Sequence, residues 1–212
     1  MNVLLLGASG RIGQRTATEL LDRGHTVTGV SRSGTVEGTD ADGFVAVAGD
    51  ATVASDVAKL AAGHDAVVST LGPSDDESPE VLLDMIRAVV EGLRRADVER
   101  VIWTGGAGGL TVGPETMLVE TDDFPEEWDA IARAAIEAYD ILSEADDLAW
   151  SYLAPAALIE PGERTGKYRT ADRELVTDDE GDSYISMEDF AVALVDELEN
   201  ENAVHTYLGT GY

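Results

Sequence analysis

Three glycines spaced three residues apart, Gly7, Gly10 and Gly13, stand near the N-terminus in the sequence GASGRIG. The apolar run 2–6 precedes them, and residues 11–23 follow with apolar side chains at helical spacing. Small residues let the backbone come close to a phosphate, and the free N–H groups at a helix N-terminus favour its negative charge. The pattern therefore predicts a buried strand, a tight turn and a helix that together hold the diphosphate of a nucleotide.

The end of the second predicted strand, residues 25–30, bears on which nucleotide binds. Chains that choose NAD usually place Asp or Glu about 20 residues after the glycines, where it bonds the ribose 2′-hydroxyl. Here Ser31 and Arg32 follow the strand, and a guanidinium can grip a phosphate through two hydrogen bonds. Arg11 and Arg15 add positive charge near the predicted diphosphate. We therefore expect NADP(H) to be preferred over NAD(H); an ordinary solvated loop arginine is the alternative interpretation of Arg32.

A proton donor for alcohol or carbonyl chemistry is not evident. Dehydrogenases acting on alcohols normally use a tyrosine whose pKa is lowered by a lysine one helical turn further on. None of the six tyrosines has a lysine four residues later, and the three histidines are scattered. Four acidic clusters lie in predicted loops and are interpreted as solvated surface rather than as metal ligands or acid–base pairs: 75–77, 122–123, 146–147 and 178–180. No metal site is predicted.

Hydride transfer to a flat acceptor tolerates the lack of an acid or base. Transfer from nicotinamide C4 to a flavin N5 or a quinone needs stacking and alignment, and the acceptor can take its proton from water. We therefore expect an NAD(P)H-dependent oxidoreductase whose substrate is FMN, FAD or a quinone. Two alternatives stay open: a non-catalytic NADP(H)-sensing protein, and an isomerase or reductase of another small molecule that uses an acid such as Tyr168.

Strands and helices alternate along the chain, and the strands are mostly apolar. Strands are predicted at 2–6, 25–30, 44–48, 66–70, 98–104, 150–153 and 204–208, helices at 11–23, 52–62, 78–93, 125–145 and 187–198, and a Gly-, Ser- and Thr-rich loop at 31–42. This alternation predicts an α/β fold of Rossmann type, a doubly wound and mostly parallel sheet with helices on both faces. Ligands of such sheets bind outside the carboxyl ends of the strands, where the strand order reverses.

One domain is predicted for residues 1–212. Its third helix is expected to have Ser78 as the cap and Pro79 at the first helical position, where the missing N–H costs nothing. The stretch 154–183 has few helix signals and is interpreted as a small lid on the substrate side of the sheet. Within it, two short extended runs are predicted, at 167–170 and 174–177.

Acidic residues outnumber basic ones by 42 to 14, which gives a formal net charge of −28. Their repulsion is long-ranged at low ionic strength, where the Debye length is roughly 30 Å, and short-ranged at molar salt, where it is about 3 Å. Because acids occur along nearly the whole chain, we expect a cytoplasmic protein of a salt-accumulating halophile. An acidic surface for a basic partner is the alternative. The same charge argues against nucleic acid as a partner.

Cysteine is absent, so disulfides and thiolate ligands are excluded. The first residues are predicted as strand rather than as a signal peptide, and no apolar run approaches the roughly 20 residues of a membrane span. We therefore expect a soluble intracellular protein without a membrane partner. Its expected partner is a small-molecule acceptor, and its expected state is a monomer or a homodimer.

Eight motifs are spread along nearly the whole chain: GASGRIG at 7–13, GD at 49–50, HDAVVSTLG at 64–72, WTGGAGGL at 103–110, TDDFPEEW at 121–128, SYLAPAALIEPGERTGKYR at 151–169, ISMEDFAVALVDELE at 185–199 and LGTGY at 208–212. With these motifs the sequence resembles the NAD(P)H-binding atypical short-chain dehydrogenases known as NADH-flavin reductases, and more distantly biliverdin reductase B and NmrA-like proteins. Where relatives that use tyrosine carry Tyr-x-x-x-Lys, this chain has Trp128 and Ala132. That departure disfavours alcohol dehydrogenase and epimerase chemistry.

The resemblance implies which residues contact each part of a bound NADP(H). The diphosphate would lie against Gly7, Ser9, Gly10, Ile12 and Gly13, with Arg11 beside it. The ribose or its 2′-phosphate would lie against Ser31 and Arg32, and the adenine against Asp50 and Ala51. The nicotinamide half would lie against Thr70, Leu71, Gly72, Thr104 and Pro155. We expect Thr104 and the backbone of Gly105 and Gly106 to orient the nicotinamide or the acceptor, so Thr104 is the candidate catalytic positioning residue.

Overall fold

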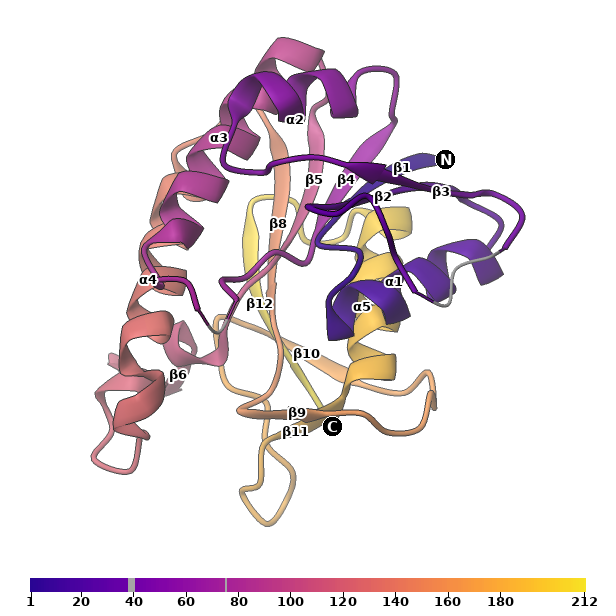
Figure 1. The fold of residues 1–212 in the computed structure, drawn as a ribbon. Helices are drawn as coiled ribbons and strands as arrows, with labels where there is room; N and C mark the ends of the chain where they lie inside the picture. The colour runs from indigo at the N-terminus through magenta and orange to yellow at the C-terminus, as the bar shows by residue number, and fades with distance from the viewer. Residues whose placement is uncertain (38–40, 75) are drawn as a thin grey trace.

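An eight-stranded sheet forms the centre of the molecule in the computed structural model, which describes residues 1–37, 41–74 and 76–212 (Figure 1). Its strand order is β10-β12-β8-β5-β4-β1-β2-β3, and every neighbouring pair is parallel except β10 with β12. The strands are β1 (Asn2–Leu6), β2 (Thr26–Ser31), β3 (Phe44–Ala48), β4 (Ala66–Ser69), β5 (Arg100–Thr104), β8 (Ala149–Ala154), β10 (Arg169–Asp172) and β12 (Thr206–Gly211). The order reverses between β1 and β4, which confirms the predicted doubly wound Rossmann-type fold.

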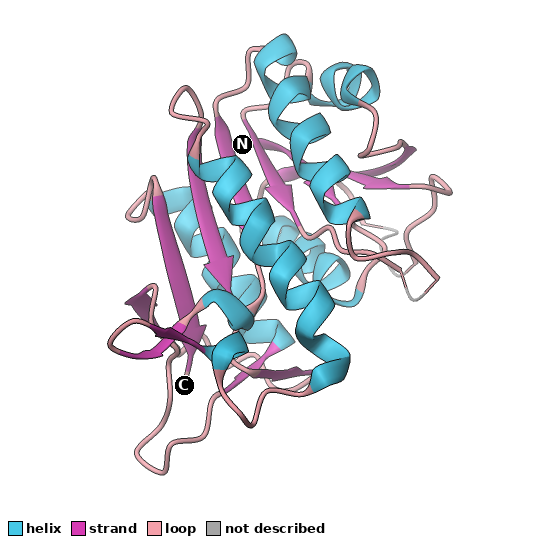
Figure 2. Ribbon diagram, turned by 90° about the vertical axis from the view of Figure 1, so that its left-hand side faces the viewer, coloured by secondary structure: helices cyan, strands magenta, loops and turns pink. Residues whose placement is uncertain are grey.

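Helices cover both faces of this sheet. Helices α1 (Arg11–Asp22) and α5 (Met187–Asn200) pack together on one face. Helices α2 (Ala54–Ala61), α3 (Val81–Ala96) and α4 (Glu126–Ser143) pack on the other, and Figure 2 shows long helices of this face lying in front of the strands. The predicted helices therefore all form, with ends that differ from the prediction by a few residues.

The side chains of β1 show how the two cores divide. Val3 and Leu5 belong to the core beneath α1 and α5, while Leu4 and Leu6 belong to the core beneath α2, α3 and α4. All four are fully buried. Because successive side chains of a strand point to opposite faces and both faces are covered, the strand needs an unbroken apolar sequence. This requirement explains why residues 3–6, which directly precede the glycines, are all apolar.

Short strand pairs outside the main sheet are absent from the sequence-based prediction. They are β6 (Thr111–Gly113) with β7 (Thr116–Met117), and β9 (Leu158–Glu160) with β11 (Tyr184–Ser186). Two 3-10 turns, η1 (Ala107–Gly109) and η2 (Leu118–Glu120), flank the first pair. Strands this short leave too little periodicity to recognise. The extended run predicted at 174–177 is wrong, because it forms no strand and contributes only a single bridge from Glu174 to Thr111.

The predicted start of the third helix is also wrong. Helix α3 begins at Val81, its cap position is Glu80, and no side chain caps it. The Ser78 hydroxyl donates to the Glu80 carboxylate instead of accepting from the helix. Pro79 lies in the preceding turn, where its carbonyl accepts from the N–H of Leu82. The loop predicted at 31–42 lies partly outside the described residues.

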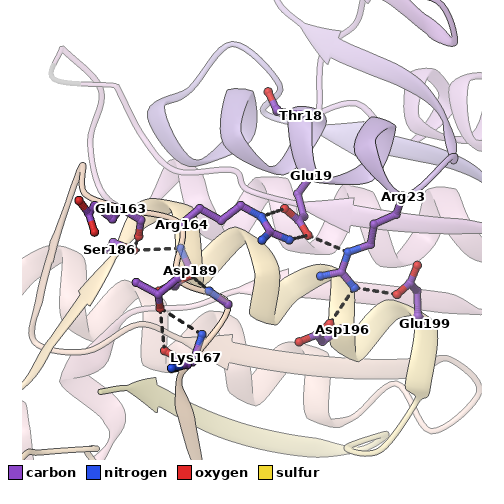
Figure 3. A network of polar contacts seen from close by, with 12 residues as sticks. Thr18, Glu19, Arg23, Glu163, Arg164, Lys167, Ser186, Asp189, Asp196 and Glu199 are labelled. Atoms are coloured by element: carbon purple, nitrogen blue, oxygen red, sulfur yellow. Dashed lines mark hydrogen bonds and ion pairs between the residues drawn. The ribbon is translucent and has the colours of Figure 1, made fainter.

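Residues 161–168, here called the strap, run along helices α1 and α5 (Figure 3). Arg164 donates from Nε and Nη2 to the carboxylate of Glu19 on α1, at 2.6 and 2.7 Å, and that carboxylate also accepts from Arg23 at 2.7 Å. The Glu19 side chain is only 4% exposed, and its hydrogen bonds from Arg164 and then Arg23 hold its pKa below the ordinary value. This ion-paired cluster ties the strap to α1.

A buried carboxylate on α5 holds the other end of the strap. Asp189 is fully buried and accepts from the Thr165 hydroxyl at 2.5 Å, the Gly166 N–H at 2.7 Å and the Tyr212 hydroxyl at 2.7 Å. The strap is therefore a fixed part of the helical face.

Within the described ranges no helix has both the length and the apolar character to cross a lipid bilayer.

The net charge of −28 leads to a prediction about salt. We expect the thermal midpoint to rise by about 10 °C or more between about 0.1 M and 2 M KCl, because screening removes repulsion among the acids. Differential scanning fluorimetry measures the midpoint, and sorbitol at equal osmolality serves as the control that does not screen charge. A midpoint that does not change, or that rises equally in sorbitol, contradicts the prediction.

Candidate functional site

A cleft of about 460 Å³ lies at the carboxyl ends of β1, β2, β3 and β4. It spans the point between β1 and β4 where the strand order reverses, which is where ligands of such sheets bind. Its predicted lining residues come from the turns after these strands and are Gly7, Ser9, Gly10, Ser31, Arg32, Asp50, Ala51, Thr70, Leu71 and Gly72. The structure thus brings together residues that the sequence assigned to the adenosine and diphosphate end of a dinucleotide with three that it assigned to the nicotinamide half, Thr70, Leu71 and Gly72.

The glycine turn after β1 has no room for side chains. Gly7 has a φ of +78°, and a Cβ there would lie 2.7 Å from the carbonyl oxygen of Thr70. A Cβ on Gly13 would lie 2.1 Å from the carbonyl oxygen of Gly7. The Thr70 hydroxyl donates to the carbonyls of Leu6 and Gly7, at 3.0 and 3.2 Å, and so fixes the turn against β4. Glycine is required at these positions by close approach and by backbone conformation.

The N-terminus of α1 opens from this turn. Gly10 is its cap residue, no side chain in the described part of the chain caps it, and its first turn carries no acid. Such an end leaves backbone N–H groups free and carries the positive end of the helix dipole, both of which favour an anion. Arg11, Ile12 and Gly13 supply this first turn, although none of the three is among the residues that line the cleft. Arg15 is paired instead with Glu188 of α5.

Two of the residues assigned to the nicotinamide half, Thr104 and Pro155, lie further along the same sheet edge. Thr104 ends β5, and Pro155 directly follows β8, the strand that pairs with β5. Neither they nor Gly105 line the cleft. The Thr104 hydroxyl is buried and has no hydrogen-bond partner among the residues described.

Two tyrosines support the glycine loop that follows Thr104. A Cβ on Gly105 would lie 2.0 Å from the ring of Tyr152. Tyr152 is fully buried, donates to the Ala135 carbonyl at 2.8 Å, and has its pKa raised well above the ordinary value by burial. Tyr207 donates to the carbonyl of Gly106 at 2.9 Å. The Tyr207 hydroxyl therefore holds the loop directly, whereas the Tyr152 hydroxyl is bonded to α4 and its ring packs against Gly105.

The titratable side chains that line the cleft, among the residues described, are those of Arg32, Asp50 and Glu77. Among the residues whose placement is described, no tyrosine, histidine or lysine lines it. Tyr168, the acid named for the isomerase alternative, lies on the α5 flank, where it donates to Asp196 at 2.5 Å and burial raises its pKa. Trp128 is 58% exposed in the first turn of α4, and Ala132 packs beside Gly108. Over the described ranges no three His, Asp or Glu side chains gather as metal ligands.

The strap also differs from the lid that the sequence suggested. Of the described residues in 154–183, none lines the cleft, and residues 161–168 are bonded to α1 and α5. The strap is held there by the buried carboxylates of Glu19 and Asp189 rather than by contacts at the sheet edge. A lid function for the remainder of that stretch stays a prediction.

Sequence reasoning missed Glu77, which lines the cleft. Its Oε1 accepts from Nη1 of Arg32 at 2.9 Å, and its Oε2 accepts from the N–H and the hydroxyl of Ser74, at 3.0 and 2.6 Å. The hydrogen bonds from Ser74, and to a lesser degree Arg32, hold the pKa of Glu77 below its ordinary value. Asp50 similarly accepts from the N–H and hydroxyl of Thr52, which lower its pKa. Asp75, from the same acidic cluster as Glu77, lies outside the described residues.

The family profile described as NAD(P)H-binding matches residues 7–201 of the sequence. The chain belongs to this family. A curated relative is the uncharacterised protein YwnB of Bacillus subtilis (strain 168), which is 34% identical over 208 residues that cover 94% of this chain and 93% of YwnB.

Solved structures agree with this assignment. A candidate exported protein from Burkholderia pseudomallei is 40% identical, with a TM-score of 0.91 and full coverage of both chains. A candidate NADH-flavin reductase from Streptococcus pneumoniae TIGR4 is 29% identical, with a TM-score of 0.87 and coverage of 100% and 99%. A short-chain dehydrogenase/reductase from Veillonella parvula DSM 2008, solved in complex with NADP, is 20% identical with a TM-score of 0.77, covers 100% and 94%, and shows likeness of fold alone.

Proposed function

We propose that this protein is an NAD(P)H-dependent oxidoreductase that reduces a flat acceptor, a flavin or a quinone, and that it prefers NADP(H). The observation that carries the proposal is the cleft at the β1–β4 switch, which joins a tight glycine turn, an uncapped helix N-terminus and Arg32. Each of these features fits one part of a dinucleotide with a 2′-phosphate.

The diphosphate would be held by backbone rather than by side chains. The N–H groups of the first turn of α1 are free to donate to its oxygens, and the helix dipole adds to the attraction. Gly7 and Gly13 allow the turn to pack this closely, because a Cβ on either would collide with the backbone of Thr70 or Gly7. The network from Thr70 to Leu6 and Gly7 keeps the turn in this shape before a ligand arrives.

The adenosine end would lie between the turns after β2 and β3. Arg32 extends from the end of β2 with its side chain 67% exposed, in reach of a group on the ribose 2′ position. Ser31 and Ala51 line the same part of the cleft, and the Asp50 carboxylate is held in place by Thr52. A guanidinium binds phosphate more strongly than a hydroxyl, which favours NADP(H).

The nicotinamide end would lie against Thr104 and Pro155. When bound, the nicotinamide supplies a hydride, and a flavin or quinone that accepts it completes its reduction with a proton from water. The Thr104 hydroxyl, which lacks a partner in the described structure, would orient the reacting rings. Because no tyrosine, histidine or lysine lines the described cleft, alignment rather than proton transfer would supply the catalysis. The name of the Streptococcus pneumoniae relative supports the same acceptor class.

Oxidation of NADPH tests the proposal directly. The loss of NADPH absorbance should be followed with FMN, FAD and a soluble quinone, under anaerobic conditions and in KCl sufficient to keep the protein folded. We expect turnover well above the reaction of free flavin with NADPH. Tight binding of NADPH without turnover of any of the three acceptors would contradict the reductase and favour a sensing protein.

Replacement of Arg32 tests the preference for NADP(H). Arg32→Glu should weaken NADPH binding by about 30- to 100-fold and NADH binding by less than about 3-fold, because only the 2′-phosphate loses a charged donor and gains a repulsive neighbour. Isothermal titration calorimetry measures both constants. Arg95→Glu, which makes the same charge change at an exposed position on α3, is the matched control. Equal weakening of both coenzymes by Arg32→Glu would contradict the 2′-phosphate assignment.

A further inference from the structure

The guanidinium assigned to the 2′-phosphate has a competing partner. Arg32 directly follows β2, Glu77 lies in the loop between β4 and α3, and both line the cleft. Nη1 of Arg32 and Oε1 of Glu77 are 2.9 Å apart. The two residues stand 45 positions apart in the sequence. The pair therefore bridges two of the turns that form the adenosine end of the cleft.

The Glu77 side chain is held in this position by hydrogen bonds to Ser74. The N–H and hydroxyl of Ser74 both donate to Oε2, and the N–H of Glu77 donates back to the Ser74 carbonyl at 2.9 Å. These bonds leave Oε1 facing Arg32. The Glu77 side chain is 30% exposed, whereas that of Arg32 is 67% exposed, so the carboxylate is the more fixed partner.

A 2′-phosphate would meet this carboxylate on the guanidinium that it needs. A phosphate binds arginine best through two parallel hydrogen bonds, and Glu77 already accepts from one of the terminal nitrogens. The negative charges of the phosphate and of Glu77 would also repel each other on either side of Arg32. Asp50 is a third acid nearby, since the positive charge of Arg32 helps to lower its pKa. A ribose 2′-hydroxyl carries no charge and needs no such displacement.

We propose that Glu77 is a coenzyme-specificity residue, which competes with the 2′-phosphate for Arg32 and so narrows the preference for NADP(H) over NAD(H). This inference rests on the proposed function, because it assumes that a dinucleotide occupies the cleft. An exposed ion pair contributes little free energy, so Glu77 weakens NADPH binding without preventing it. Ser74 is the positioning residue that keeps the carboxylate in place.

The test compares binding of NADPH with NADH, and of 2′,5′-ADP with 5′-AMP, by isothermal titration calorimetry. Glu77→Gln should tighten NADPH and 2′,5′-ADP by about two- to fivefold at about 0.2 M KCl. NADH and 5′-AMP should change by less than about 1.5-fold. Ser74→Ala should act in the same direction but less strongly. The gain should fade at about 2 M KCl, because exposed charges are screened there.

Two further variants identify the cause of the gain. In an Arg32→Gln background, Glu77→Gln should increase the logarithm of the NADPH binding constant by less than about half as much as it does in the original protein, because no guanidinium is left to compete for. Glu80→Gln makes the same charge change three residues away, outside the cleft lining, and should leave all four constants unchanged.

The outcomes separate the two proposals. If the unaltered protein binds neither coenzyme, the proposed function fails and the specificity role fails with it. If it binds both coenzymes but Glu77→Gln leaves their ratio unchanged, weakens NADPH, or acts no more strongly than Glu80→Gln, the specificity role alone is overturned. A full gain in the Arg32→Gln background would also overturn it, because Glu77 would then act by general repulsion.

Discussion

Gly13→Ala is expected to weaken binding of both NADPH and NADH by about 100-fold or more. Its Cβ would lie 2.1 Å from the carbonyl oxygen of Gly7 and 2.9 Å from the hydroxyl of Thr70. The nearer atom belongs to the backbone of a buried turn, which cannot yield as a flexible side chain can, so the first turn of α1 must move. Displaced N–H groups no longer converge on the diphosphate, and such positioned donors contribute most when their geometry is fixed. Calorimetry measures the two binding constants.

Gly113→Ala is the matched control for this variant. A Cβ on Gly113 would have no atom within 4 Å, the residue has an ordinary φ, and it lies in β6 away from the cleft. This substitution should leave both binding constants unchanged. Gly10→Ala, whose Cβ would lie 3.2 Å from the Gly7 carbonyl oxygen, gives a milder version should Gly13→Ala fold poorly. Coenzyme binding by a folded Gly13→Ala protein within about 3-fold of the original would contradict the role of the turn.

Glu197→Ala is expected to lower the free energy of unfolding by about 3–5 kcal/mol, because it leaves Arg100 charged and unpaired in the interior. The side chains of Glu197 and Arg100 are 5% and 7% exposed, and their Oε1 and Nη2 atoms lie 2.8 Å apart. The same carboxylate oxygen accepts from the Ser151 hydroxyl at 2.8 Å and from the N–H of Ala203 at 3.1 Å. Urea unfolding followed by circular dichroism measures the loss.

The exposed pair of Glu91 and Arg95 provides the comparison. Glu91→Ala removes an ion pair of similar length, 2.9 Å, but both side chains are about half exposed, so the loss should stay below about 1 kcal/mol. Arg100 begins β5, at the end of the sheet opposite the cleft. Coenzyme affinity of folded Glu197→Ala should therefore be unchanged. A loss below about 1 kcal/mol for Glu197→Ala would contradict the account of this buried pair.

Local sequence signals were sufficient for the main features of the fold and for much of the site. The apolar run of β1, the glycines and the helical periodicity of α1 lie within 22 residues of each other and carry their own information. The turn residues after β2, β3 and β4 could be placed at one edge because parallel strands align their carboxyl ends. These patterns could be recognised without any knowledge of distant contacts.

Features that depend on long-range pairing could not be predicted. The sequence alone indicates that Glu77 belongs to a solvated acidic cluster. Its pairing with Arg32 depends on the approach of its loop to the end of β2, which the sequence does not show. The sequence suggested that the strap is part of a lid. Its position is set instead by two buried carboxylates, Glu19 on α1 and Asp189 on α5, from helices that are distant in sequence. The halophilic origin, the cytoplasmic location, the small-molecule partner and the monomeric or dimeric state stay predictions.

A crystal structure grown with millimolar NADPH tests the central claim most directly, that the first turn of α1 holds the diphosphate of a dinucleotide. The account predicts the coenzyme across the β1–β4 switch, with its diphosphate oxygens within hydrogen-bond distance of the N–H groups of Arg11, Ile12 and Gly13. A cleft without coenzyme at that concentration, or NADPH bound elsewhere on the protein, would contradict it.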